Sequence, residues 1–171
     1  GLANAIAAGC DTGEHAVGLT QAQADEMVRK GPYYDPTLTR YLEPYMDDND
    51  AKSTGGKYSM TKIFAAAVTL AGKTPNLAVM VGSGVDGSTF VHGTQALEFE
   101  SLVKRGGLTP ARAIQAGTIV NARIMGWEDR IGSIGTGKLA DVIAVSGEPP
   151  ADLTDLHRAK LGSQGGPVVG A

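Results

Sequence analysis

The sequence alternates short strand-like segments with helical patterns, and this alternation is the feature that most restricts its possible folds. The strand-like segments are CDTGEH, PYYDPTLT and LAVMVGS, at residues 10–15, 32–39 and 77–83. Helical patterns lie before, between and after them, at residues 2–8, 20–31, 58–73, 94–106 and 109–124. In this order the strands usually run parallel and the helices cover the sheet. The sequence therefore predicts an α/β fold with a parallel sheet.

Two of these helices begin with clear capping signals. Thr20 is followed three residues later by Gln23, which predicts a capping box, and Gly31 is the expected end of that helix. Thr109 precedes Pro110, a residue that favours the first position of a helix. Both starts therefore have a local physical reason.

Composition limits the class of protein. The chain has 171 residues, the size of one domain, and its 15 Lys and Arg against 18 Asp and Glu give a net charge of −3 with no block of like charge. Nucleic acid and anionic membranes are therefore not expected partners. The single cysteine, Cys10, excludes an internal disulfide framework and a thiol metal cluster.

The sequence also carries no targeting signal that we can recognise. No apolar run approaches the roughly 20 residues that span a bilayer, and the start GLANAIAAGCD lacks the features of a signal peptide. The sequence therefore does not indicate the cellular compartment of the protein. Because the chain begins directly on an Ala-rich helical pattern without Met, we expect it to be cut from a longer protein.

Three residues are candidates for chemistry. His15 ends one predicted strand, Asp86 follows another, and His92 lies six residues after Asp86. The carboxyl ends of parallel strands share one rim, so we expect the side chains of His15 and Asp86 to converge there. Imidazole and carboxylate are zinc ligands, although a catalytic zinc needs three protein ligands. The alternative is that both side chains only cap loops and helix N-termini by hydrogen bonds.

Three motifs resemble the metal-dependent amidohydrolase superfamily, in its imidazolonepropionase-like and Xaa-Pro dipeptidase-like branch. The run from AIAAGCDTGEH to PYYDPTLT looks like the sixth and seventh barrel strands of that family, and GVDGSTFVHG resembles its eighth-strand motif. The segment LTPARAIQAGTIVNARIMGWEDRIGSIGTGKLADVIAVSGEP is similar to the closing helix and the entry to the family's small β-sandwich. The resemblance implies the C-terminal part of a (β/α)8 TIM barrel, roughly strands 6–8 with their helices, over 1–130. It implies a remnant of the sandwich with a flexible tail over 131–171.

The resemblance also implies roles for residues. By position, His15 matches the metal-ligating histidine of the sixth strand, and Asp86 matches the aspartate that binds metal and acts as general acid and base. His92 matches a histidine on the substrate side. Asp141 belongs to the sandwich signature, and we expect it to bind nearby backbone donors. The implied cofactor is a divalent metal, zinc in the first place, as one ion or two.

The chain lacks other ligands that the resemblance would require. The family's His-x-His and its fifth-strand histidine have no counterpart here. The expected function is therefore hydrolysis of an amide or peptide bond in a small molecule or dipeptide, with this chain supplying the C-terminal half of the site. A missing N-terminal half, or a homo-oligomer partner, would supply the rest. The rival hypothesis is a non-catalytic, truncated or degenerate half-barrel that folds by association through its open sheet edges.

For several other residues the sequence predicts a structural role. The amphipathic pattern around Glu98 and Glu100 predicts a solvated face for both carboxylates, and Trp127 is expected to be a packing anchor. The glycine-rich end after Pro150 is weakly patterned, so we expect it to be poorly ordered. The remaining interpretations place the aromatic residues in the core and the last histidine in a surface or packing role: Tyr33, Tyr34, Tyr41 and His157.

Overall fold

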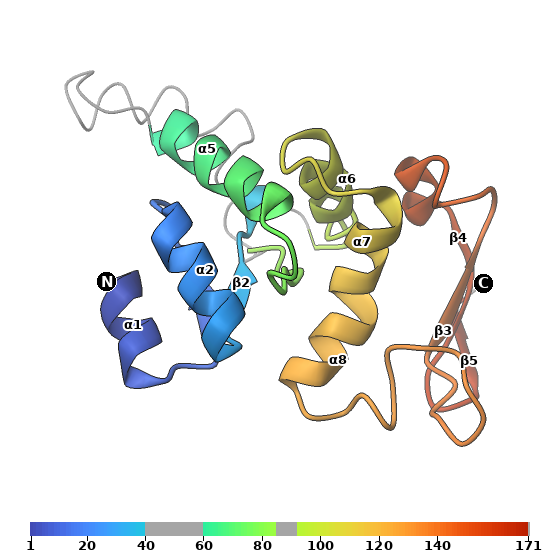
Figure 1. Ribbon diagram of the computed structural model, residues 1–171. Helices are drawn as coiled ribbons and strands as arrows, with labels where there is room; N and C mark the ends of the chain where they lie inside the picture. The colour runs from blue at the N-terminus through green and yellow to red at the C-terminus, as the bar shows by residue number, and fades with distance from the viewer. Residues whose placement is uncertain (40–59, 85–91, 171) are drawn as a thin grey trace.

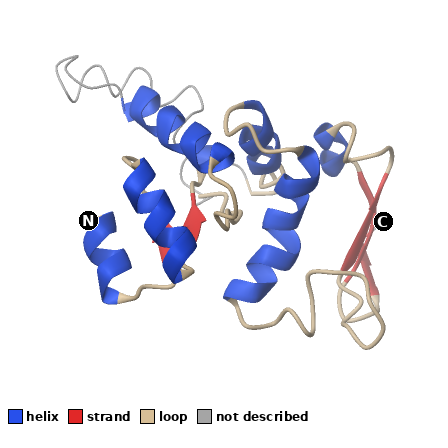
Figure 2. Ribbon diagram, in the orientation of Figure 1, coloured by secondary structure: helices blue, strands red, loops and turns tan. Residues whose placement is uncertain are grey.

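The computed structural model describes residues 1–39, 60–84 and 92–170. It begins with helix α1 (Leu2–Ala8), strand β1 (Thr12–Glu14), helix α2 (Gln21–Lys30) and strand β2 (Tyr33–Asp35). Helix α5 (Met60–Lys73) and helix α6 (Leu97–Lys104) follow, and a long helical stretch comprises α7 (Pro110–Gln115), the π-helical segment η1 (Ala116–Val120) and α8 (Asn121–Ile124). The alternation of strands and helices in the first half, shown in Figure 1 and Figure 2, confirms the predicted α/β class.

The predicted helix signals act locally as expected. The Thr20 side chain accepts a hydrogen bond from the Gln23 N–H, the Gln23 side chain accepts one from the Thr20 N–H, and Gly31 ends the helix in a left-handed conformation. The Thr109 side chain accepts a hydrogen bond from the Arg112 N–H, with Pro110 at the helix start. These caps fix where α2 and α7 begin.

The first sheet is parallel. Strand β1 pairs with β2 in the register Thr12 with Tyr33 and Glu14 with Asp35. A third parallel segment lies on the other side of β2, where the Tyr34 N–H donates to the Ala78 carbonyl and Tyr34 pairs with Val79. The sequence predicted a strand at 77–83, but in the structure this segment contributes one isolated bridge.

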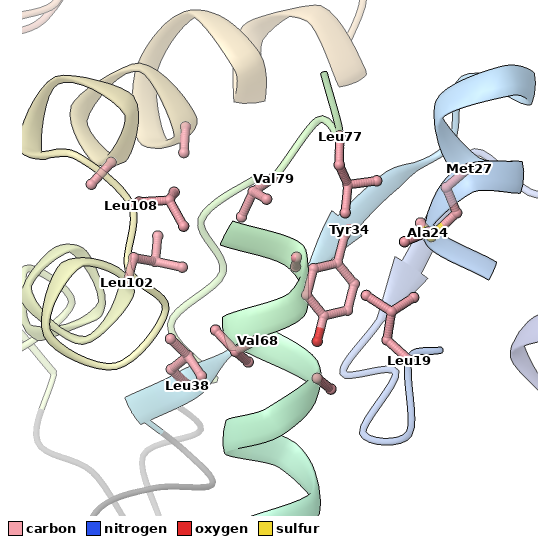
Figure 3. Close-up of a cluster of buried hydrophobic side chains, with 14 of the residues drawn as sticks. Leu19, Ala24, Met27, Tyr34, Leu38, Val68, Leu77, Val79, Leu102 and Leu108 are labelled. Carbon is pink, nitrogen blue, oxygen red and sulfur yellow. The ribbon is translucent and has the colours of Figure 1, made fainter. Parts of the chain in front are cut away.

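A hydrophobic core fills the space between this sheet and its helices. The ring of Tyr34 points away from β2 into a cluster that includes Leu19, Val68 of α5 and Leu77 (Figure 3). Tyr34 is fully buried, as predicted for an aromatic residue of a core strand. Other core side chains come from α2, α6, α7 and η1: Ala24, Met27, Leu102, Ala113 and Ala116.

The C-terminal part forms a second sheet at the opposite end of the molecule from α1 (Figure 1). Strand β3 (Val142–Val145) pairs antiparallel with β4 (Ala159–Ser163), which pairs with β5 (Val168–Gly170). A 3-10 helix, η2 (Leu153–His157), connects β3 to β4. The sequence predicts a poorly ordered end, whereas these residues form two strands, because the backbone of β4 pairs with that of β3 and the backbone of β5 pairs with that of β4. Within the described residues, no helix has the length and apolar character needed to cross a bilayer.

Candidate functional site

Polar side chains gather where β1 and β2 end. Glu14 is the last residue of β1 and His15 follows it, while Asp35 is the last residue of β2 and Thr37 lies two positions beyond. Glu14 and Asp35 are direct partners in the parallel register. Because both strands run in the same direction, these four side chains lie on one rim of the sheet. His15 is thus at the carboxyl end of its strand, as predicted.

The imidazole of His15 contacts the neighbouring strand's loop. Its Nδ1 lies 2.6 Å from Oγ1 of Thr37, and the Thr37 hydroxyl also donates to the carbonyl oxygen of Pro36 at 2.8 Å. Thr37 is buried and His15 is exposed. The ring is therefore held at Nδ1 by a buried hydroxyl.

Asp35 organises the backbone of this rim. Its carbonyl oxygen accepts a hydrogen bond from the His15 N–H at 2.7 Å, and its Oδ1 accepts one from the Thr37 N–H at 3.2 Å. Burial raises the pKa of the Asp35 carboxyl to about 7, and its hydrogen bond with Glu14 and the charge of Glu14 add to the rise. The carboxyl also packs so closely on Gly82 that a Cβ at position 82 would collide with it. Asp35 thus links all three parallel segments.

Glu98 is a buried carboxylate that the sequence placed wrongly on a solvated face. It is 0% exposed, and its oxygens accept hydrogen bonds from the Leu38 N–H at 2.6 Å and from the N–H and hydroxyl of Thr39 at 2.7 Å each. Burial raises the pKa of Glu98, and the three hydrogen bonds oppose that rise. The helix α6 is therefore tied to the segment that follows β2.

Sequence reasoning missed Asp35 and Glu98 as parts of this region. The only available signal for Asp35 was its position at the end of a strand, next to Pro36, on the rim that His15 shares. For Glu98 the helical period indicated a solvent-exposed position, whereas the side chain is buried. Its neighbour Glu100, by contrast, is partly exposed and pairs with Lys104 and His157, the latter at 2.7 Å.

The other two predicted site residues are Asp86 and His92. Asp86 lies outside the described residues, so the predicted convergence of His15 and Asp86 stays a prediction. His92 is exposed in a turn before α6. Among the residues that the structure describes, no group of three or more His, Cys, Asp and Glu side chains could hold a metal ion.

The chemistry of the described donors fits one position of a zinc site. A zinc-ligating histidine usually donates a hydrogen bond from the ring nitrogen that does not touch the metal. In His15 the nitrogen Nδ1 has such an oxygen partner, Oγ1 of Thr37. A catalytic zinc needs two further protein ligands. The described residues of this chain therefore fit a part of such a site and not a complete one.

The sandwich signature has a structural role in the described region. Asp141 Oδ1 accepts a hydrogen bond from the Gly165 N–H at 2.7 Å, which confirms its predicted binding to a backbone donor. Lys138 donates to the hydroxyl of Ser133 at 2.6 Å and to the carbonyl oxygen of Glu128. Trp127 is 46% exposed, with the guanidinium of Arg130 5.0 Å from its ring centroid, so the predicted packing anchor is wrong.

Comparison with known proteins shows which larger enzymes share this architecture. Ochratoxinase from Aspergillus niger is 30% identical over 168 residues, which cover 94% of this chain and 33% of that enzyme. The crystal structure of the A. niger ochratoxinase superposes with a TM-score of 0.85 at 26% identity, over 99% of this chain and 39% of that one. The chain therefore spans about a third of the length of the curated relative that it matches.

Two further solved structures agree. A Xaa-Pro dipeptidase with methionine bound in its active site matches with a TM-score of 0.81 at 26% identity, over 99% of this chain and 42% of that chain. A putative prolidase from Bifidobacterium longum matches with a TM-score of 0.79 at 28% identity, over 98% of this chain and 44% of that chain. The chain thus has the fold of part of these larger enzymes. The amidohydrolase family matches residues 2–164, and this chain belongs to that family.

Proposed function

We propose that this chain is the C-terminal part of a metal-dependent amidohydrolase that hydrolyses an amide or peptide bond. The observation that carries the proposal is the rim at the carboxyl ends of β1 and β2, where His15 is held by Thr37 in a chain of the amidohydrolase family. We assign β1, β2 and the segment 77–83 to the sixth, seventh and eighth strands of a TIM barrel. Residues 131–171 correspond to the small sandwich domain.

In this proposal His15 and Asp86 are metal ligands and Asp86 also handles the proton of the hydrolytic water. A divalent ion, zinc in the first place, would polarise the scissile carbonyl and make a bound water more acidic if these residues held it. The carboxylate of Asp86 would accept the proton of the water and return it to the leaving nitrogen. His92 lies on the substrate side. The remaining ligands come from outside this chain, from an N-terminal half or from an oligomer partner.

The substrate is a small molecule or dipeptide with an amide bond. A Xaa-Pro dipeptidase and a putative prolidase are among the structural relatives, and this supports a dipeptide-like substrate. The competing hypothesis, a non-catalytic half-barrel, has the same fold and differs in whether His15 binds metal.

The test measures Zn²⁺ binding by isothermal titration calorimetry, and then turnover. We expect weak Zn²⁺ binding by the chain, loss of that binding in His15→Ala and no loss in the matched control His157→Ala, whose ring pairs with Glu100 away from the rim. With the missing ligands supplied by the longer protein, dipeptide hydrolysis should appear, and Asp86→Asn should abolish it while metal remains bound. Binding that does not depend on His15, or full activity in Asp86→Asn, would contradict the proposal.

A further inference from the structure

We infer that Thr37 is a positioning residue that keeps the proton of the neutral His15 ring on Nδ1 and so makes Nε2 the nitrogen that can bind a metal ion. The inference deepens the proposed function, because it concerns the same histidine. The evidence for it comes from contacts among the described residues. Its tautomer part can be tested without metal and without turnover.

The first step is a count of protons between His15 and Thr37. The Thr37 hydroxyl has one proton, which it donates to the carbonyl oxygen of Pro36 at 2.8 Å. The short contact of 2.6 Å between Thr37 Oγ1 and His15 Nδ1 therefore needs its proton from the ring. Nδ1 then carries hydrogen, and Nε2 of the neutral imidazole carries the lone pair.

The second step is the backbone that brings these two side chains together. His15 has φ of 62° and Thr37 has φ of 46°, in the left-handed region that residues other than glycine uncommonly adopt and β-branched residues such as threonine rarely adopt. Such conformations persist where the surroundings impose them. Here Asp35 does so, because its carbonyl oxygen binds the His15 N–H and its carboxyl binds the Thr37 N–H.

The third step is that the hydroxyl of Thr37 cannot move away easily. Thr37 is 3% exposed, and Asp35 beside it is 4% exposed and packs against Gly82. The acceptor for His15 Nδ1 is therefore a fixed feature of the sheet rim rather than a mobile surface group. A hydrogen bond at the second ring nitrogen sets both tautomer and ring orientation, and its loss typically weakens metal binding about 10–100-fold.

The experiment reads the tautomer of His15 by long-range ¹H–¹⁵N correlation NMR of the histidine-labelled chain without metal, at a pH where the ring is neutral. The His15 signals are assigned by their loss in His15→Gln. We expect the Nδ1–H form in the unchanged chain, a shift toward the Nε2–H form in Thr37→Val, and retention of the Nδ1–H form in Thr37→Ser. An Nε2–H form in the unchanged chain, or an unchanged tautomer in Thr37→Val, overturns the inference.

A matched control separates this effect from the general cost of removing a buried hydroxyl. Thr74, the residue after helix α5, is buried and its hydroxyl donates to the Leu70 carbonyl of that helix, so Thr74→Val should leave the His15 tautomer unchanged. Zn²⁺ titration adds a second readout, with affinity reduced about 10–100-fold in Thr37→Val and retained in Thr37→Ser. If the tautomer responds as expected and no variant binds Zn²⁺, the positioning of the ring stands and the proposed function fails. If Zn²⁺ binds through His15 with the proton on Nε2, the inference fails and the proposed function stands.

Discussion

Glu98 Oε2 accepts hydrogen bonds from both the backbone N–H and the hydroxyl of Thr39, each at 2.7 Å. The two residues are 59 positions apart in the sequence, on helix α6 and in the segment after β2. The second oxygen of the same carboxylate binds the Leu38 N–H. One buried side chain thus accepts hydrogen bonds from two backbone donors, and it holds the chain immediately after the rim that carries His15.

Replacing this carboxylate by an amide should destabilise the fold. In Glu98→Gln one of the three donors from Leu38 and Thr39 would face an NH2 group, and a buried donor without an acceptor costs about 1–3 kcal/mol. Urea denaturation followed by circular dichroism measures the loss. Glu26→Gln, on the exposed face of α2, is the control and should change stability much less. Equal effects in both variants would contradict this role for Glu98.

The same carboxylate should give the unfolding free energy a pH dependence. Because burial raises the pKa of Glu98 in the folded chain, the native state binds more protons than the unfolded state between the ordinary value near 4.5 and the raised value. Stability should therefore fall as the pH rises through that window. Denaturation curves at a series of pH values, compared between the unchanged chain and Glu98→Gln, isolate this contribution. A difference between the two proteins that does not change with pH would show that the pKa of Glu98 is not raised.

Local signals in the sequence were sufficient for several elements. The capping box of Thr20 and Gln23, and Thr109 with Pro110, depend on residues within one helical turn, so their geometry follows from short-range chemistry. The parallel order and the place of His15 at a strand end follow from the alternation of segments. These are the parts of the fold for which local preference and tertiary structure agree.

Long-range contacts account for what the sequence could not indicate. Glu98 looks like a solvated helix residue because its partners lie 59 and 60 positions away. Strands β4 and β5 have weak patterns of their own and acquire order from the sheet, in which β4 pairs with β3 and β5 pairs with β4. The 77–83 segment reads as a full strand, yet it forms one bridge, next to the place where Gly82 meets the Asp35 carboxyl.

The Thr20 cap gives a prediction of known size. Thr20→Ala removes the acceptor for the Gln23 N–H at the start of α2 and should cost about 1 kcal/mol, whereas Thr20→Ser should cost less because it keeps the hydroxyl. Thermal unfolding of the three proteins measures the difference. If the Thr20→Ala protein were as stable as the Thr20→Ser protein, the cap would not contribute to stability.

Gly82 should tolerate no side chain. A Cβ at this position would collide with the Asp35 carboxyl, which is held by the Thr37 N–H. Gly82→Ala should therefore destabilise the chain by about 1–3 kcal/mol, as overpacking in a core does, and should disturb the His15 signals in NMR spectra. The control is Gly135→Ala, where a Cβ would meet only the Lys138 side chain, at ordinary contact distance. A Gly82→Ala protein with unchanged stability and unchanged His15 signals would contradict the packing of Asp35 on this backbone.

The C-terminal sheet should make the chain self-associate. In the described part of the structure β3 pairs with β4 only, and its apolar residue Ile143 is 59% exposed, next to a hollow of about 500 Å³ that Ile134 also lines. An apolar edge strand of this kind favours pairing with another chain.

We expect a dimer or larger species by light scattering at micromolar concentration, and a shift toward monomer in Ile143→Lys because a charge on the strand opposes edge pairing. Val28→Lys is the matched control, since Val28 is an exposed apolar residue of α2 at the far end of the molecule, and it should leave the mass unchanged. A compact monomer in the unchanged chain, or equal effects of the two substitutions, would show that the β3 edge is not the association surface.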